Sequence, residues 1–133
     1  MKKIGILNAQ LSCIVASMGH TDKLVIGDSG LPVPRGKEIV DLALTTNIPR
    51  FLDVVEIVLK ELQVEEALIA KETEQNSPSV YTGLKNLLGE AKITSLSHQE
   101  FKNLSERETN IAFVRTGEAT PFANVMLVSG VTF

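Results

Sequence analysis

The chain has 133 residues, 44% hydrophobic and 22% charged, with a net charge of −3. This length suits one domain over residues 1–133, and the ordinary composition excludes a disordered or coiled-coil protein. An acidic chain lacks the long-range attraction that draws proteins to nucleic acid or anionic membranes, so we expect neither partner. One cysteine and two histidines provide no zinc-ligand spacing, and no stretch has the length of a membrane helix or the pattern of a signal peptide. We expect a cytoplasmic protein.

The first half of the chain alternates helical and extended patterns. Apolar residues recur at helical spacing before Gly19, and a short apolar run is bounded by Asp22 and Asp28. The eight residues that follow include two Gly and two Pro and therefore form a loop. In chain order we predict a helix over 8–18, a buried strand over 23–27, a loop over 29–36, a strand within 39–44 and a helix from Pro49 to about Leu62.

The helix predicted after Pro49 is unusually apolar. Only Asp53, Glu56 and Lys60 provide a narrow polar stripe, whereas a surface helix normally has a wider polar face. The excess apolar surface needs a cover, and another subunit is one candidate for it.

The second half continues the alternation. Ser77-Pro78 combines a cap with a first-turn proline, and Ser97 with Glu100 fits a capping box. We predict strands over 64–70, 91–96, 111–115 and 125–129, helices over 78–88 and 97–104, and a loop over 116–124. Strands that alternate with helices indicate a three-layer α/β/α sandwich with a mainly parallel sheet.

Few side chains are suited to acid–base chemistry. His20 follows a predicted helix end, which favours the protonated ring, and His98 lies in a first turn, which favours the neutral ring. Asp28, His98 and the 116–124 loop each follow a predicted strand, where ligands of α/β sheets bind. Asp28 and Asn124 offer hydrogen bonds to a sugar. The alternative is that both histidines are surface residues, that Asp28 caps a turn and that Asn124 only ends a loop.

Other polar residues have simpler interpretations. Arg115 and Glu118 can pair across their turn, and Cys13 lies off the apolar stripe of its helix. These residues therefore predict an α/β domain with a candidate histidine–carboxylate site, and they name no substrate.

Three blocks of sequence provide further information about the function of the chain. They are Leu7-Asn-Ala followed by Gly19-His-Thr-Asp22, then Ile26-Gly-Asp-Ser-Gly-Leu-Pro-Val-Pro34, then Arg115-Thr-Gly-Glu-Ala-Thr-Pro-Phe-Ala-Asn124 with the terminal Gly130-Val-Thr-Phe133. In this order, and over essentially the whole chain, they resemble the D-ribose pyranase family of sugar mutarotases, which is related to L-fucose mutarotase.

The resemblance implies an enzyme that interconverts the pyranose and furanose rings of D-ribose without a cofactor or metal. It implies that His20 is the catalytic acid and that Asp28, His98 and the segment Phe122-Ala123-Asn124 contact the sugar. The family commonly has Tyr where Phe122 stands, so this chain lacks one hydroxyl there, although the ring face can still pack on sugar C–H groups.

The family also forms ring-shaped homo-oligomers, decamers of two stacked pentamers with sites near subunit contacts, and the same assembly is expected here. Three other functions stay open at this stage. They are mutarotation of another sugar such as L-fucose, non-catalytic sugar binding in a ribose uptake system, and a plain interaction domain.

Overall fold

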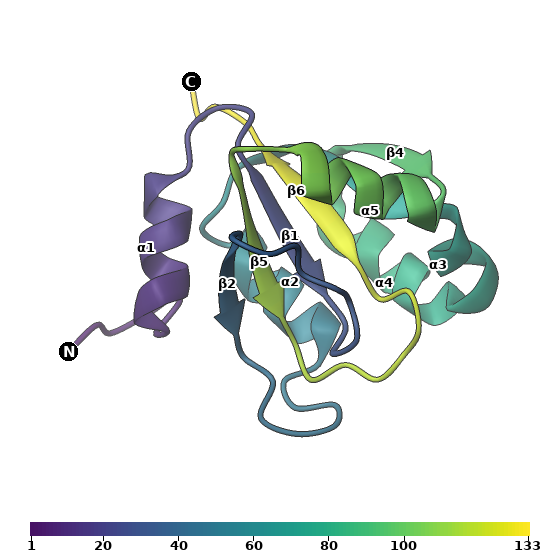
Figure 1. Ribbon diagram of the computed structural model, residues 1–133. Coiled ribbons are helices and arrows are strands. Elements are labelled where there is room, and N and C mark those ends of the chain that lie inside the picture. The colour runs from purple at the N-terminus through teal and green to yellow at the C-terminus, as the bar shows by residue number, and fades with distance from the viewer.

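Six strands form one sheet in the computed structural model, which describes all of residues 1–133 (Figure 1). The strand order across the sheet is β2-β5-β1-β6-β3-β4. The strands are β1 (Lys23–Gly27), β2 (Glu38–Asp41), β3 (Val64–Ala70), β4 (Lys92–Leu96), β5 (Ile111–Arg115) and β6 (Val125–Ser129).

Five of these strands run in one direction and β6 runs against them. We call the end of the sheet where the five terminate its carboxyl end, and the opposite end its amino end. β6 is reversed because the 116–124 loop stays at the carboxyl end, so the chain re-enters the sheet from where β5 left it (Figure 1). The prediction of a mainly parallel sheet is confirmed, with one antiparallel strand near its centre.

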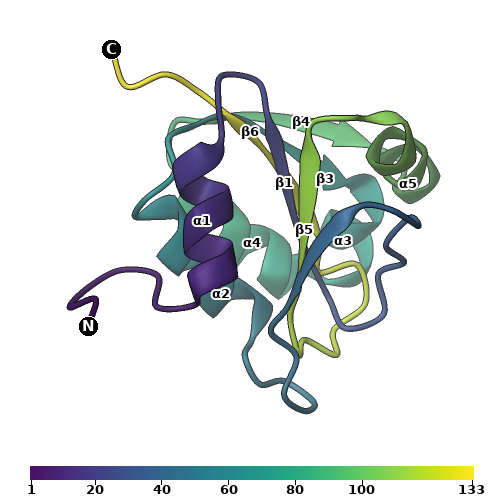
Figure 2. The same cartoon turned by 60° about the vertical axis from the view of Figure 1, so that its left-hand side comes forward.

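Helices cover both faces of the sheet, as a three-layer sandwich requires (Figure 2). One face packs against α1 (Ala9–Ser17), α2 (Phe51–Leu59) and α4 (Pro78–Leu88), and the other against α5 (His98–Arg107). Alternate strand residues supply the two apolar clusters: Leu24 and Ile26 belong to the larger one and Val25 to the smaller.

Several elements differ from the predictions. The apolar helix begins at Phe51 and ends at Leu59, so Pro49 precedes it rather than opening it. β2 is shorter than the 39–44 pattern and starts one residue earlier. A short helix that the sequence did not reveal, α3 (Lys71–Asn76), follows β3 directly. Its residues are nearly all polar, so there is no apolar periodicity by which to predict it.

The apolar surface of α2 is covered mainly by the chain itself. The excess apolar surface of this helix is therefore not a reason to expect another subunit over it. Phe51, Val55 and Val58 are fully buried, and Leu52 packs against α4 so closely that a Cβ on Gly83 would meet its Cδ1 at 2.5 Å. Only Ile57 remains well exposed, at 45%.

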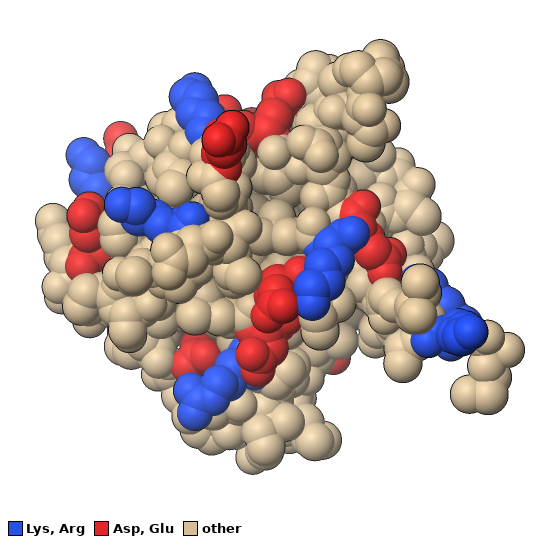
Figure 3. Space-filling model, turned by 180° about the vertical axis from the view of Figure 1, so that it is seen from behind, with Lys and Arg blue, Asp and Glu red and all other residues tan.

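The remaining surface carries charges of both signs. Acidic and basic side chains are interspersed on the face seen from behind, with wide uncharged areas between them (Figure 3). None of the helices is long and apolar enough to cross a membrane.

Candidate active site

Polar side chains gather at the carboxyl end of the sheet. Asp28 directly follows β1, His98 opens α5 after β4, and Asn124 directly precedes the reversed β6. They come together because the carboxyl ends of parallel strands and the amino end of an antiparallel strand lie at the same end of a sheet.

Asn124 and Asp28 are joined through the main chain. The Asp28 N–H donates to Oδ1 of Asn124 over 3.1 Å, and the Asn124 side chain is almost wholly buried. Gly27 makes this approach possible, since a Cβ there would lie 2.8 Å from the same oxygen. The amide of Asn124 is thereby fixed beside the Asp28 carboxyl group.

Phe122 is held against His98 by an unusual stretch of loop. Its φ of 59° lies in the left-handed region, and its carbonyl accepts hydrogen bonds from Thr73 Oγ1 at 2.7 Å and from the Asn124 N–H at 2.9 Å. Its ring meets the His98 ring edge-on, with centroids 5.1 Å apart. The adjoining Ala123 is fully buried in the larger apolar cluster, between Phe122 and Asn124 in the chain.

His98 sits in a partly apolar setting. Its ring lies between Phe122 and Phe101, and burial lowers the pKa of His98, helped by the nearby Lys102, while Glu72 and Asp28 raise it less. The neutral ring is therefore favoured at neutral pH, which agrees with the expectation from its first-turn position.

The pKa of Asp28 is raised, whereas that of His98 is lowered. Burial raises it above the ordinary range for an aspartate, and the Gly30 N–H, which donates to Oδ1 over 2.9 Å, and the Asn124 amide lower it only in part. A partly desolvated carboxyl beside a neutral imidazole is a pair suited to proton exchange and to binding hydroxyl groups.

Two buried polar atoms at this site have no partner in the protein. They are Nδ1 of His98 and Nδ2 of Asn124, of which Nδ2 lies near the Asp28 carboxyl but makes no hydrogen bond of standard geometry with it. Because a buried polar atom without a hydrogen bond carries a desolvation penalty of about 1–3 kcal/mol, such atoms are suited to receive a ligand's polar groups. Hydroxyl groups, which both donate and accept, are the simplest match.

His20 lies elsewhere. It follows α1 and precedes β1, at the amino end of the sheet, and its exposed ring meets Glu65 with 3.0 Å between Nε2 and Oε2. β1, which separates it from Asp28, spans about 13 Å at the usual rise per residue. Within one chain the structure thus brings together every predicted site residue except His20.

Several other polar residues are engaged in structural contacts. Arg115 pairs with Asp41 and not with Glu118, so that expectation is wrong. Glu118 is buried and accepts hydrogen bonds from Thr120 and from the Phe51 N–H. Burial raises the pKa of Glu118, but these hydrogen bonds outweigh it and leave the pKa lowered.

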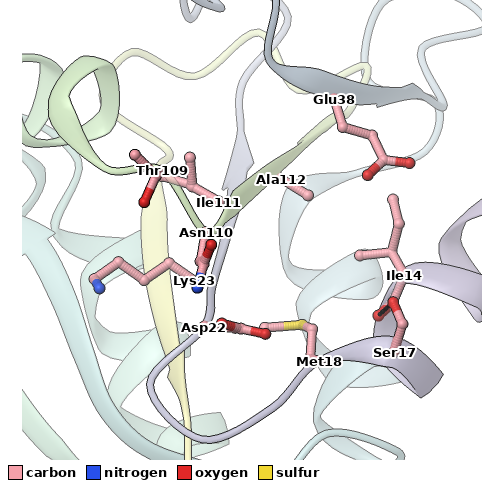
Figure 4. A pocket seen from close by; sticks show the side chains of 10 residues that line it. All are labelled: Ile14, Ser17, Met18, Asp22, Lys23, Glu38, Thr109, Asn110, Ile111 and Ala112. Carbon is pink, nitrogen blue, oxygen red and sulfur yellow. Dashed lines mark hydrogen bonds between the residues drawn. The ribbon is translucent and has the colours of Figure 1, made fainter.

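A hollow at the amino end is a weaker candidate for a binding site. It lies between α1 and the start of β1 and β5, with Asp22, Lys23 and Glu38 among its lining residues (Figure 4). The Asp22 carboxylate already accepts the Gly19 N–H, and the Lys23 ammonium pairs with Glu108 at 3.0 Å. Two of its three charged groups are thus already satisfied.

Three residues around the site were missed by sequence reasoning. Glu72 accepts the His98 N–H at 2.8 Å, Thr73 anchors the Phe122 carbonyl, and Lys102 lies one turn after His98. The spacing of four residues on a helix was a signal for Lys102. No local signal marked Glu72 or Thr73, since both belong to the unpredicted α3.

Comparison with known proteins identifies the family of this chain. A model of the RbsD / FucU transport protein family matches residues 1–132. The chain belongs to the RbsD / FucU transport protein family. Relatives named D-ribose pyranase include one from Symbiobacterium thermophilum, 56% identical, and one from Coprothermobacter proteolyticus, 51% identical, each over the whole length of both chains.

Solved structures of other proteins share the fold. Bacillus subtilis RbsD complexed with D-ribose is 45% identical, covers both chains fully and superposes with a TM-score of 0.94. The fucose mutarotase of Streptococcus pneumoniae in complex with L-fucose is 20% identical over 96% of this chain and 95% of its own, with a TM-score of 0.78. At that identity the second match shows the fold alone.

Proposed function

We propose that this protein interconverts the pyranose and furanose forms of D-ribose by opening and reclosing the sugar ring. The observation that carries the proposal is full-length similarity to relatives named D-ribose pyranase. The group of Asp28, His98 and Asn124, with its two unpartnered polar atoms, supports it because a sugar presents hydroxyl groups to such a site.

The chemistry requires only proton movements. The ring oxygen gains a proton as its bond to C1 breaks, and the C1 hydroxyl loses one to become a carbonyl. Closure through a different hydroxyl reverses both transfers. We assign the acid to His20 and sugar binding to Asp28, His98, the ring of Phe122, Ala123 and the amide of Asn124. Positioned acid–base groups accelerate such steps by roughly 10²–10⁴-fold, which suits a reaction that already occurs in water.

A complete site then needs two copies of the chain. His20 lies at the amino end of the sheet and the sugar-binding residues at the carboxyl end, so we infer that His20 reaches the site of a neighbouring copy. Contacts between unlike ends are head-to-tail, and repeated contacts of this kind form a ring when the rotation between neighbouring copies closes. This supports a ring-shaped homo-oligomer, with the decamer as the expected form.

The surface offers an apolar area for such contacts. Leu7 and Ile57, which are 71% and 45% exposed, line one hollow together with Leu42 and Pro49. Apolar side chains grouped in this way typically mark an interface between proteins. Light scattering is expected to give a mass several times the 14.5 kDa of one chain, and a monomer would contradict the assembly.

The activity is tested by NMR exchange between the ribose ring forms. Wild-type protein is expected to accelerate pyranose–furanose exchange, and His20→Ala to abolish the acceleration while circular dichroism shows an intact fold. Saturable ribose binding without acceleration would identify a non-catalytic sugar-binding protein instead, faster anomer exchange of L-fucose alone would identify a different mutarotase, and no sugar binding would indicate an interaction domain.

We also propose a cytoplasmic location, with residues 1–133 acting as one domain. The single free thiol, Cys13, is exposed, which fits a reducing compartment.

A further inference from the structure

His20 has one defined partner, the carboxylate of Glu65 at the start of β3. Oε2 of Glu65 lies 3.0 Å from Nε2 of His20, and both side chains are about half exposed. A carboxylate only accepts hydrogen bonds, so this contact requires the hydrogen of His20 to be on Nε2. Nδ1 is then the ring atom left for other partners.

The sheet is irregular at this point, which is a second observation independent of the contact. Val64 pairs with Ser129 and Glu66 with Val128, so two steps along β3 match one step along β6 and Glu65 is the extra residue of a bulge. Bulges often lie next to active sites, where they redirect a side chain that a regular strand would aim elsewhere. Here the redirected side chain is the one that contacts His20.

Adjoining segments of the same chain keep Glu65 in place. The Gly130 N–H donates to the carbonyl of Gln63 at 2.9 Å, and a Cβ on Gly130 would lie only 3.1 Å from the Glu65 Cβ and 3.5 Å from its Oε2. On the other side, the Thr21 N–H donates to the Ser129 carbonyl at 2.9 Å, which fixes the segment that carries His20. Both partners are therefore held by main-chain bonds to the end of β6.

We propose that Glu65 is a positioning residue for the reaction, which orients the His20 ring and holds its proton on Nε2 so that Nδ1 exchanges protons with the sugar. The inference rests on the proposed function, because it concerns the acid of that reaction. Glu65 itself touches no reacting atom in this scheme.

The proton balance is complete with this assignment. The protonated ring gives its Nδ1 proton to the ring oxygen as the C1–O bond breaks and its electron pair goes to that oxygen. The C1 hydroxyl releases its proton to a base or to water at the site, which forms the carbonyl. On closure another sugar hydroxyl attacks C1, its proton returns to Nδ1, and the carbonyl oxygen regains a proton. The Nε2 proton stays on the hydrogen bond to Glu65 throughout.

The test compares Glu65→Ala and Glu65→Gln with wild type, in the intact assembly. Glu90→Ala serves as a matched control, since Glu90 is exposed and makes no hydrogen bond or ion pair. Exchange of ribose ring forms measures the reaction, and the ¹⁵N chemical shifts of the histidine rings report the tautomer. With two histidines in the chain, the His20 signals are identified by their loss in His20→Ala.

We expect Glu65→Ala to slow exchange by about 10-fold, as loss of a partner that orients a histidine does in other sites, and to shift the ring signals away from the form protonated on Nε2. Glu65→Gln keeps an acceptor oxygen and is expected to retain more activity than Glu65→Ala. Glu90→Ala is expected to match wild type in both measurements.

Two results would overturn the inference. One is a Glu65→Ala protein with unchanged exchange and ring signals. The other is slower exchange that is accompanied either by unchanged ring signals or by an altered mass in light scattering. Either combination would assign Glu65 to assembly instead. If wild type itself does not accelerate exchange, the proposed function fails and the ring signals still show whether Glu65 sets the tautomer.

Discussion

At the scale of single residues, the site is defined by polar atoms that the fold leaves unsatisfied. Nδ1 of His98 and Nδ2 of Asn124 are buried without a hydrogen bond of standard geometry, and the nearby Asp28 carboxyl is partly desolvated. The burial of each of these polar groups lowers the free energy of unfolding of the protein, and a bound polyol is expected to restore it. Substitutions here should therefore separate stability from activity.

Phe122 is the first case. Adding a hydroxyl with Phe122→Tyr extends the ring that lies 5.1 Å from His98, and a hydrogen bond of about 0.5–1.5 kcal/mol would lower the ribose concentration at half-maximal exchange by about 2- to 10-fold. The measurement is the dependence of the NMR exchange rate on ribose concentration. An unchanged dependence would mean that the edge of the ring points away from the sugar.

Asp28→Asn is the second case. We expect it to slow exchange by about 10- to 100-fold, since a hydrogen bond to a charged group is lost, yet to leave the unfolding midpoint at pH 7 equal or higher. The pKa of Asp28 is raised in the folded protein. The stabilisation that Asp28 provides is therefore complete at pH values below its pKa in the unfolded chain, and it is lost as the pH rises through its pKa in the folded protein.

The stability advantage of Asp28→Asn is therefore expected to narrow as the pH is lowered from 7 toward 4, and thermal denaturation across that range measures it. A variant less stable than wild type at pH 7 would show that the carboxylate stabilises the loop more than its burial destabilises the fold.

At the scale of elements, the short helix α3 supports the site although it carries no predicted site residue. Glu72 accepts the His98 N–H and Thr73 holds the Phe122 carbonyl, so one turn of helix positions both sides of the aromatic contact. The apolar helices and strands were predicted because burial imposes a period on their sequence. The helix α3 was not predicted, because the positions of its residues depend on contacts with the distant 116–124 loop.

Thr73→Val tests that support. It keeps the shape of a fully buried side chain but removes the donor to the Phe122 carbonyl, so we expect stability to fall by about 1 kcal/mol and the ribose concentration at half-maximal exchange to rise.

Ser105→Ala is the matched control for Thr73→Val. It removes an equally buried hydroxyl that donates within α5 to the Phe101 carbonyl at 2.8 Å. A similar loss of stability with unchanged ribose dependence is expected there. If both variants change the ribose dependence alike, α3 has no special part in the site.

At the scale of the whole molecule, the sheet separates the acid from the sugar-binding residues. His20 and Glu65 lie at one end and Asp28, His98 and Asn124 at the other, so each chain is expected to contribute to two sites. This division makes the reaction dependent on assembly.

Mixing two variants that are defective at different residues tests the division directly. In assemblies formed from equal amounts of His20→Ala and Asp28→Asn chains, about a quarter of the sites would receive both native residues from different copies. After mixing and reassembly, exchange is expected to be faster than with either variant alone. If His20 and Asp28 act from the same chain, every site stays defective and mixing recovers nothing.

The sequence by itself determined the layered α/β fold, most element positions, both histidines as candidate acid–base residues and the resemblance on which the substrate rests. Those features are local, since the period of apolar residues, the caps and the motifs are all properties of short stretches. Tertiary structure alone decided that β6 runs backwards, that α4 covers α2, and that His20 stands apart from Asp28 and beside Glu65. These depend on contacts between residues far apart in the chain, whose geometry no short stretch encodes.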